Sequence, residues 1–169
     1  VGASSMTINW TNGNGSNRIV VMKQGSTVTG TPLNNTTYTA NSVFGSGITL
    51  NTGEYIVYNN TGSSVTVSNL VSGQSYYISV FEYNCDPGSE IYLVPGTAAS
   101  RQTYSIVTGT VPESQYCVTG ISGYTTTIDF VSTGTFSNNI YTAELSDAIG
   151  SFENPDIIGS IASNLNAET

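Results

Sequence analysis

Carboxylates are the side chains of this sequence with the widest catalytic use. Glu54, Glu82, Asp129 and Glu144 are four of the 11 acidic residues, and two carboxylates placed across a sugar can cleave a glycosidic bond. Each of the four lies in a stretch that alternates as a strand, where we expect solvent-facing or edge positions. Histidine is absent, which removes the Ser-His-Asp and Cys-His nucleophile systems. We therefore expect a protein that is not an enzyme.

Two acidic groups offer oxygen ligands of the kind that Ca²⁺ prefers. They are Asp86 with Glu90, and Asp147 with Glu153 and Asp156. Neither has the spacing of a dedicated calcium loop, so solvated loop acids are the simpler interpretation. No group of Cys and His has the spacing of a zinc site. We expect no cofactor, and Ca²⁺ is the one ion that these acids would suit.

The two cysteines, Cys85 and Cys117, allow either one disulfide or two free thiols. A disulfide requires Cα atoms within about 7 Å of each other, and a separation along the chain does not fix that distance. Both alternatives stay open.

The charge balance limits the partners of the chain. Three Lys and Arg stand against 11 Asp and Glu, which gives a net charge of −8. So few cations cannot neutralise a row of phosphates, and we expect neither nucleic acid nor an anionic membrane surface as a partner. No stretch reaches the roughly 18 apolar residues of a spanning helix, so we expect no membrane insertion. Residues 1–3 lack the features of an export signal, which we expect to lie upstream in a longer precursor.

The elements that position these acidic residues and cysteines are expected to be β-strands. Hydrophobic residues make up 38% of the chain, with 11 Tyr, and the apolar stretches alternate, which favours a folded all-β protein. We expect strands over residues 4–11, 18–23, 54–58, 64–70, 76–83 and 98–104. The turn at residues 59–62 predicts a hairpin between the third and fourth of these. Residues 25–53, rich in Thr and Asn, predict short ribbons that decorate the strands.

The stretch over residues 70–83 organises the first part of the chain. Leu70 ends one strand, Gly73 permits a tight turn, and Tyr76 opens a strand in which Tyr76, Ile78 and Val80 share one face. Trp10 ends an alternating segment upstream. We expect these five apolar side chains to be buried together on the inward faces of facing sheets, with the Tyr76 hydroxyl bonded to a backbone group.

Residues 2–104 resemble a fibronectin type III-like repeat that is common in large exported proteins of Bacteroidetes-type bacteria. The resemblance covers the tyrosine corner at Tyr76 and the stretches 5–15, 38–41, 44–47, 57–59, 81–84, 92–93 and 99–100. It implies a β-sandwich domain over residues 1–104, of the fibronectin type III-like or Ig-like kind. Its first strand would lie ahead of Val1 and is missing here.

The remaining residues resemble a second β-sandwich repeat from the same kind of surface protein. Residues 105–111 predict a linker or a leading strand, and residues 112–169 resemble a partial Ig-like unit. In that family a Cys near the start, here Cys117, precedes a Thr-Gly-Thr-Phe turn, here residues 133–136. The family unit continues for several more strands, so we expect residues 112–169 not to be self-sufficient.

The resemblance implies a non-catalytic structural or adhesive segment of a large exported protein at the bacterial cell surface. Tandem repeats of this kind space or present binding regions. The implied partners are neighbouring repeats of a longer chain, together with surface glycans or other proteins. The alternative is an accessory, glycan-binding module of a secreted hydrolase.

Overall fold

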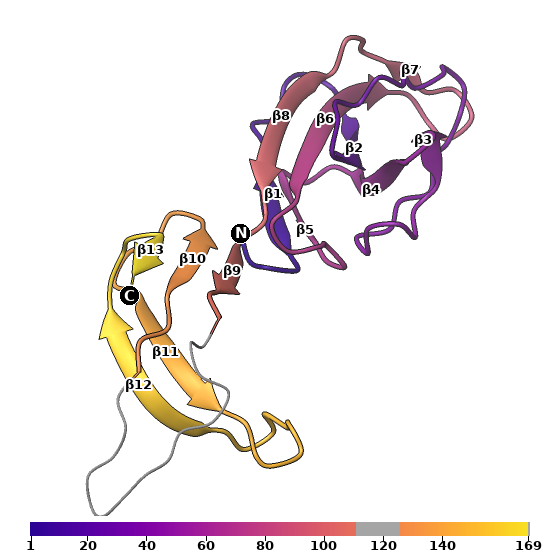
Figure 1. Ribbon diagram of the computed structural model, residues 1–169. Helices are drawn as coiled ribbons and strands as arrows, with labels where there is room; N and C mark the ends of the chain where they lie inside the picture. Colours follow the sequence, from indigo (N-terminus) through magenta and orange to yellow (C-terminus); the bar gives the residue numbers. More distant parts are fainter. Residues whose placement is uncertain (111–125, 169) are drawn as a thin grey trace, which may run out of the picture. The chain divides into compact units, whose positions relative to one another are not determined.

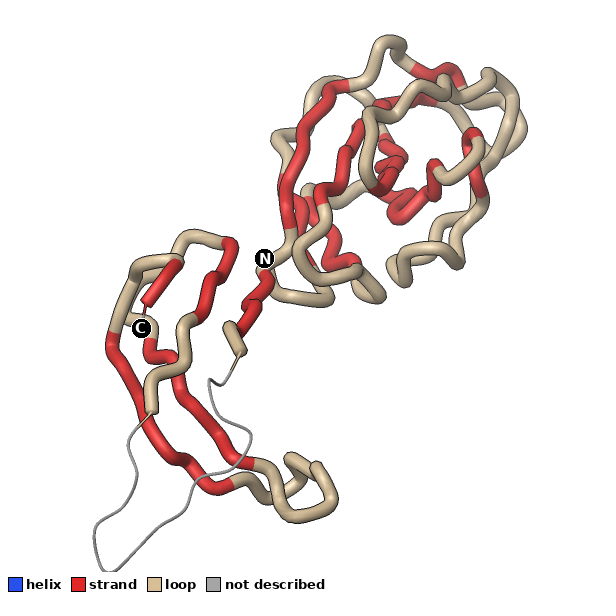
Figure 2. Tube along the Cα trace, in the orientation of Figure 1, coloured by secondary structure: helices blue, strands red, loops and turns tan. Residues whose placement is uncertain are grey.

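The computed structural model describes residues 1–110 and 126–168, and every element in that part of the chain is a β-strand (Figures 1 and 2). The chain divides into two compact units, unit 1 (Val1–Ser105) and unit 2 (Ile106–Thr169). The described part holds no helix of the length and apolar character that membrane crossing requires. The strands are β1 (Met6–Asn9), β2 (Asn17–Gln24), β3 (Thr49–Asn51), β4 (Glu54–Asn60), β5 (Ser64–Val67), β6 (Ser75–Asn84), β7 (Ile91–Tyr92), β8 (Thr97–Gln102), β9 (Ser105–Thr108), β10 (Phe130–Thr133), β11 (Ile140–Leu145), β12 (Asp156–Ala162) and β13 (Ala167–Glu168).

Unit 1 contains two antiparallel sheets. The smaller sheet pairs β1 with β5, and the larger has the order β3-β4-β2-β6-β7, with β8 also paired to β6. The prediction of an all-β chain is thus confirmed. The predicted hairpin between residues 54–58 and 64–70 is wrong, because β4 and β5 belong to different sheets.

A first apolar cluster joins the two sheets of unit 1. Met6 of β1 and Val67 of β5 pack with Val20 and Met22 of β2, and all four side chains are almost fully buried. Because side chains alternate along a strand, these residues of β2 lie on one face of the larger sheet. Tyr76, Ile78, Leu70 and Val57 complete the buried part of this cluster.

A second cluster lies on the opposite face of the larger sheet. Ile19 and Val21, the alternate residues of β2, pack there with Ile56, and all three are fully buried. Residues 25–53 supply the cover through half-buried side chains, among them those of Val28, Tyr38, Ala40 and Leu50. The segment holds one short strand, β3. It therefore closes a core, which is more than the decoration that its composition predicts.

The turn before β6 has the geometry that the sequence predicts. Tyr76 is fully buried, and its hydroxyl accepts a hydrogen bond from the Val71 N–H at 2.8 Å. Gly73 has φ +70°, a left-handed conformation that Gly adopts without strain. Trp10 and Val80 differ from the prediction, because they are only half-buried at the margin of the first cluster.

Unit 2 contains a sheet of order β13-β10-β9 and a separate β11–β12 hairpin. Of the two alternatives for residues 105–111, a linker or a leading strand, the structure has the strand at their start, where Ser105–Thr108 forms β9 beside β10. Among the described side chains of unit 2, that of Ser132 alone is buried. The large apolar side chains left exposed are Ile106, Val107, Val131, Ile140, Leu145, Ile149, Phe152, Ile157, Ile158, Ile161 and Leu165.

Three aromatic rings pack together in unit 2. The ring of Tyr141 lies 4.3 Å from that of Phe130 and 5.9 Å from that of Phe136, between centroids. Its hydroxyl lies 2.8 Å from the Ser132 hydroxyl and donates to the Leu165 carbonyl at 2.9 Å. This small cluster links β10 and β11.

Candidate functional site

Glu54 is one of the four carboxylates with catalytic potential, and it is fully buried. Its oxygens accept hydrogen bonds from the Thr29 N–H at 2.8 Å, the Gly30 N–H at 2.8 Å and the Lys23 ammonium at 3.0 Å. Burial alone would raise the pKa of Glu54, but these hydrogen bonds outweigh burial and hold that pKa below its ordinary value. The predicted solvent-facing position is therefore wrong. The carboxylate holds the start of the 25–53 segment against β4.

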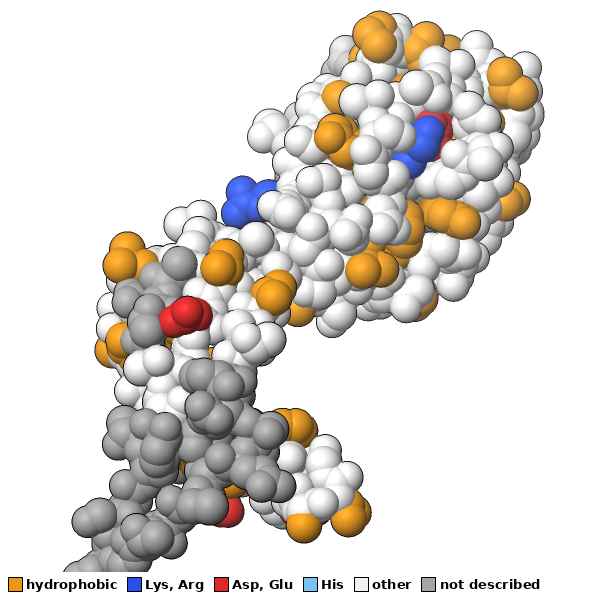
Figure 3. All heavy atoms as spheres, in the orientation of Figure 1, with side chains coloured by type: hydrophobic (Ala, Val, Ile, Leu, Met, Phe, Trp, Pro, Cys, Tyr) orange, Lys and Arg blue, Asp and Glu red, His pale blue; other side chains and the backbone are white. Residues whose placement is uncertain are grey.

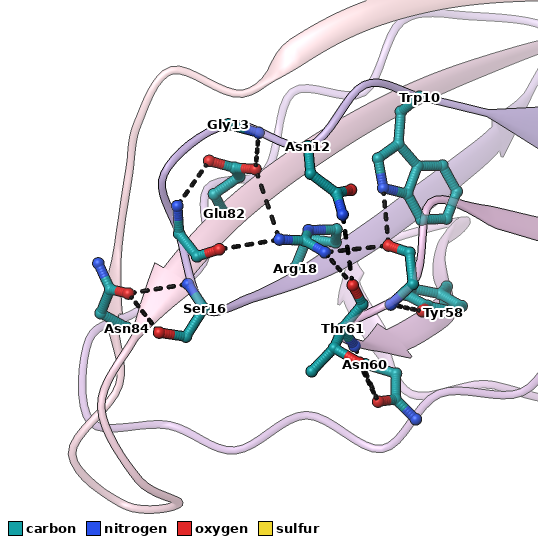
Figure 4. Close-up of polar contacts among 12 residues, drawn as sticks. Trp10, Asn12, Gly13, Ser16, Arg18, Tyr58, Asn60, Thr61, Glu82 and Asn84 are labelled. Atoms are coloured by element: carbon teal, nitrogen blue, oxygen red, sulfur yellow. Dashed lines mark hydrogen bonds and ion pairs between the residues drawn. The ribbon is translucent and has the colours of Figure 1, made fainter.

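Glu82, on β6, holds a second loop (Figure 4). Its carboxylate accepts the Gly13 N–H at 2.6 Å and the Gly15 N–H at 3.0 Å, and it lies 3.7 Å from the Arg18 guanidinium. The Gly15 hydrogen bond, together with Gly13 and the Arg18 charge, outweighs burial and lowers the pKa of Glu82. Its side chain is 15% exposed, so its predicted solvent-facing position is wrong as well.

Arg18 joins this loop to the turn after β4. Its guanidinium is 2% exposed and donates to the carbonyls of Gly15 at 2.8 Å, Gly62 at 3.0 Å and Thr61. Its Nε has no hydrogen-bond partner among the described residues. Trp10 Nε1 also donates to the Gly62 carbonyl, at 3.1 Å (Figure 4). We call Arg18, Glu82 and the backbone groups that they bind the Arg18–Glu82 clamp.

Glu90, considered above as a candidate Ca²⁺ ligand and more simply as a solvated loop acid, is buried and serves as a third loop clamp. It is 1% exposed and accepts hydrogen bonds from the Thr37 hydroxyl and from the Gly88 N–H at 2.9 Å. Burial pushes the pKa of Glu90 up, and the Thr37 and backbone hydrogen bonds outweigh it, so the pKa is lowered. Asp86, its predicted companion, is exposed. Glu90 thus fastens a second point of the 25–53 segment.

The second acidic group is also part of a loop. The Asp147 carboxylate accepts the N–H groups of Ile149 at 3.0 Å and Ser151 at 2.8 Å, which closes the turn after β11. Glu153 and Asp156 are exposed. In the part of the chain that the structure describes, no three His, Cys, Asp or Glu side chains gather into a group that would hold a metal ion.

The cysteine alternatives are not resolved by the fold. The Cys85 side chain is exposed, and its φ is +78°. Cys117 lies outside the described residues, so one disulfide and two free thiols both stay open.

A groove lies beside β1, next to the Arg18–Glu82 clamp. It has a volume of about 560 Å³. It is lined by Ile8 of β1 and the adjoining Trp10, by Ile78 and Val80 of β6, and by Ala99 of β8. Asn9, Asn14 and Glu82 add polar groups to its rim. A smaller hollow of about 210 Å³ adjoins it through Asn14, Glu82 and Leu93. The groove therefore combines an apolar lining with a few polar groups, which is the composition of many ligand sites.

Sequence reasoning missed both the clamps and the groove. One available signal was strand parity, because Glu82 continues the series Tyr76, Ile78 and Val80 and so belongs to the inward face of β6. The same parity places Glu54 with the buried Ile56. Asp129 and Glu144, the other two candidates, are exposed as predicted.

Comparisons with known proteins do not add a relative. No family model, no curated protein and no solved structure matches this chain.

Most of the surface is uncharged. The face of the molecule in Figure 3 shows isolated charged side chains among many neutral ones, as expected for a chain with 8% charged residues. A partner would therefore meet mainly uncharged groups.

Proposed function

We propose that this chain is a non-catalytic structural and adhesive segment of a large exported protein on the bacterial cell surface. In this proposal a fibronectin type III-like unit over residues 1–104 precedes a partial Ig-like unit over residues 112–169. The pairing of β1 with β5, and of β2 with β4 and β6, on opposite sides of one core supports the sandwich assignment. The sequence resemblance supports the cell-surface setting.

The observation that carries the proposal is what the carboxylates of unit 1 bind. The carboxylates of Glu54, Glu82 and Glu90 each accept hydrogen bonds from N–H or hydroxyl groups of loops. A catalytic acid needs a raised pKa and access to a substrate, whereas these three groups have lowered pKa values. These carboxylates therefore hold long loops in place. A unit whose loops are fixed in this way suits a spacer or a display surface.

A direct test assays the purified chain for turnover of polysaccharides and peptides. The proposal predicts no turnover with either class of substrate. Turnover that disappears in Glu82→Gln, while the fluorescence of Trp10 shows that the variant still folds, would show that the chain is an enzyme.

A second experiment separates spacing from adhesion. In the exporting bacterium, unit 1 is deleted or replaced with an unrelated domain of equal size. Restored attachment with the replacement identifies a spacer, and lost attachment identifies an adhesive surface.

The alternative function is a glycan-binding accessory module of a secreted hydrolase, and the groove beside β1 favours it. The indole of Trp10, the apolar lining and the amides of Asn9 and Asn14 suit the faces and hydroxyls of a sugar. Ala99 lines the groove opposite Ile78, whereas Ala98, opposite Ser79, points to the other face of β8. Titration of an oligosaccharide set should therefore show binding that Ala99→Lys abolishes and Ala98→Lys retains. A catalytic domain in the full precursor would support the same alternative.

A further inference from the structure

The loop between β1 and β2 contains the only Asn-Gly pairs of the chain, Asn12-Gly13 and Asn14-Gly15. An Asn before Gly is prone to deamidation, because no side chain shields the backbone nitrogen of the next residue. That nitrogen loses its proton and attacks the carbonyl carbon of the Asn side chain, so that a C–N bond forms and ammonia leaves. The resulting succinimide takes up water and opens to Asp or isoaspartate. The reaction therefore needs water and no other reactant.

The two Asn residues of this loop are accessible to that water. Asn12 and Asn14 are both exposed. The Asn12 amide makes one long hydrogen bond, from its Nδ2 to the Thr61 carbonyl at 3.5 Å. Burial thus protects neither side chain, and any protection must act on the attacking nitrogens.

Glu82 holds both of these nitrogens (Figure 4). Its Oε1 accepts the Gly13 N–H at 2.6 Å, and its Oε2 accepts the Gly15 N–H at 3.0 Å. Hydrogen bonds to a carboxylate are stronger than those to a neutral acceptor. The negative charge also opposes loss of either amide proton, since that loss would place a second negative charge beside the first. One carboxylate therefore suppresses the first step of deamidation at both Asn-Gly pairs.

The same contact explains why Gly follows each Asn. A Cβ on Gly15 would lie 2.7 Å from the Glu82 Cβ and 3.2 Å from the Tyr83 nitrogen, and a Cβ on Gly13 would meet the Glu82 carboxylate. Gly allows the loop to approach β6 this closely. The reactive Asn-Gly pairs and the group that protects them thus belong to one contact.

We propose that Asn12 and Asn14 form a self-modification site that Glu82 keeps unreacted. When the Glu82 carboxylate leaves the loop, the two glycine nitrogens are free to attack, and deamidation follows. The product places a new carboxylate near that of Glu82, and the two like charges repel. Isoaspartate also inserts a methylene group into the backbone of the loop. The Arg18–Glu82 clamp then cannot close in its original geometry, so the change is irreversible. This site goes beyond the proposed function and does not depend on it.

The two Asn residues should react in a fixed order. Asn12 is tied to the Thr61 carbonyl, and the nitrogen that would attack it, that of Gly13, makes the shorter bond to Glu82. The nitrogen that would attack Asn14 makes the longer bond. We therefore expect Asn14 to deamidate first.

The test is incubation of the full chain in neutral buffer, followed by mass spectrometry of its peptides. Each deamidation appears as the mass increase for replacement of an amide group by a hydroxyl. In Glu82→Gln the side chain has one oxygen for two N–H groups, so at least one glycine nitrogen loses its acceptor. We expect this variant to deamidate about tenfold faster than the wild-type chain. Glu82→Asp keeps the charge on a shorter side chain and should give a smaller acceleration; it takes the place of Glu82→Gln if that variant does not fold.

Glu54→Gln is the matched control. Glu54 also holds a loop through backbone N–H groups, but these belong to Thr29 and Gly30. We expect this variant to deamidate at the wild-type rate. The fluorescence of Trp10 shows whether each variant folds.

Two results would overturn the proposal. An unchanged or slower reaction in the Glu82 variants would show that the carboxylate does not protect the loop, and a slower one would mean that it acts as a base. Equal acceleration in Glu54→Gln would show that general loosening of unit 1 sets the rate, with no specific part for Glu82.

Discussion

Unit 1 and unit 2 are built from similar short strands and bury their side chains very differently. In unit 1 both faces of β2 are covered, with Val20 and Met22 in one cluster and Ile19 and Val21 in the other. In unit 2 the described side chain of Ser132 alone is buried, and strand β12 is exposed along its whole length. The difference shows that alternating apolar residues give strands, whereas a core requires a second layer to cover them.

The two units also differ in what their carboxylates bind. Unit 1 holds its long loops with Glu54, Glu82 and Glu90, each a carboxylate that binds groups distant in the sequence. The Asp147 carboxylate of unit 2 binds only its own turn. A chain with so few charges thus uses them at the points where irregular segments must be fixed to strands.

The largest expected effect comes from removing core volume in unit 1. Ile56→Ala deletes three carbons from a fully buried site and should lower the free energy of unfolding by about 3 kcal/mol. The matched change in unit 2 is Ile158→Ala, at a side chain that is 57% exposed. It should change stability by less than about 0.5 kcal/mol. Trp10 is the one Trp of the chain, so urea midpoints measure Ile56→Ala by its fluorescence, which reports unit 1, and Ile158→Ala by circular dichroism.

A similar comparison tests the clamps. Glu54→Ala leaves the N–H groups of Thr29 and Gly30 without their acceptor and should cost about 2 to 3 kcal/mol. Glu144→Ala removes an exposed carboxylate of unit 2 and should cost less than about 0.5 kcal/mol. Urea midpoints measure the first variant by fluorescence and the second by circular dichroism. Equal losses in the two variants would mean that the clamp contributes nothing specific.

These residues also show what the sequence could predict. The face shared by Tyr76 and Ile78 followed from alternation, and the turn at Gly73 followed from residue type. The pairing of strands across sheets did not follow, because residues 59–62 have the composition of a hairpin turn. Arg18 and Trp10 bind Thr61 and Gly62 there, and these long-range contacts hold the turn while the chain passes from one sheet to the other.

The sequence pattern also could not predict that residues 25–53 cover one face of the larger sheet. The segment has little periodicity, so its side chains have no face that can be read from spacing. Its position depends on Glu54 and Glu90, which come later in the chain. The clamps could have been found in part from the parity of Glu54 and Glu82, whereas their loop partners could not.

Acid should weaken unit 1 through its carboxylates. The pKa values of Glu54, Glu82 and Glu90 are lowered by folding from an ordinary value of 4.5, so the unfolded chain binds protons more readily. Their contribution is fully present above pH 4.5 and is lost as the pH falls through the lower folded values. The fluorescence midpoint in urea should therefore fall below that pH. Glu82→Gln should reduce the slope of this fall, and an unchanged slope would exclude Glu82 as a contributor.

The smallest effect concerns the Tyr76 hydroxyl. Tyr76→Phe removes the acceptor of the Val71 N–H and should cost about 1 kcal/mol. Tyr55→Phe is the control, because it removes the same hydroxyl from a half-buried ring. That ring packs against Phe44 at 5.1 Å between centroids. An unchanged midpoint in Tyr76→Phe would show that the turn does not need this hydrogen bond.

Amide hydrogen exchange on the intact chain tests the contrast between the units most directly. The hydrogen-bonded amides of β2, β4 and β6 should exchange only when unit 1 unfolds, because two buried clusters enclose them. The hydrogen-bonded amides of β11 and β12 should exchange at least about 100-fold faster, because their strands are exposed and can open locally. Equal protection of the two sets would contradict the account, since it would show that unit 2 has a core as stable as that of unit 1.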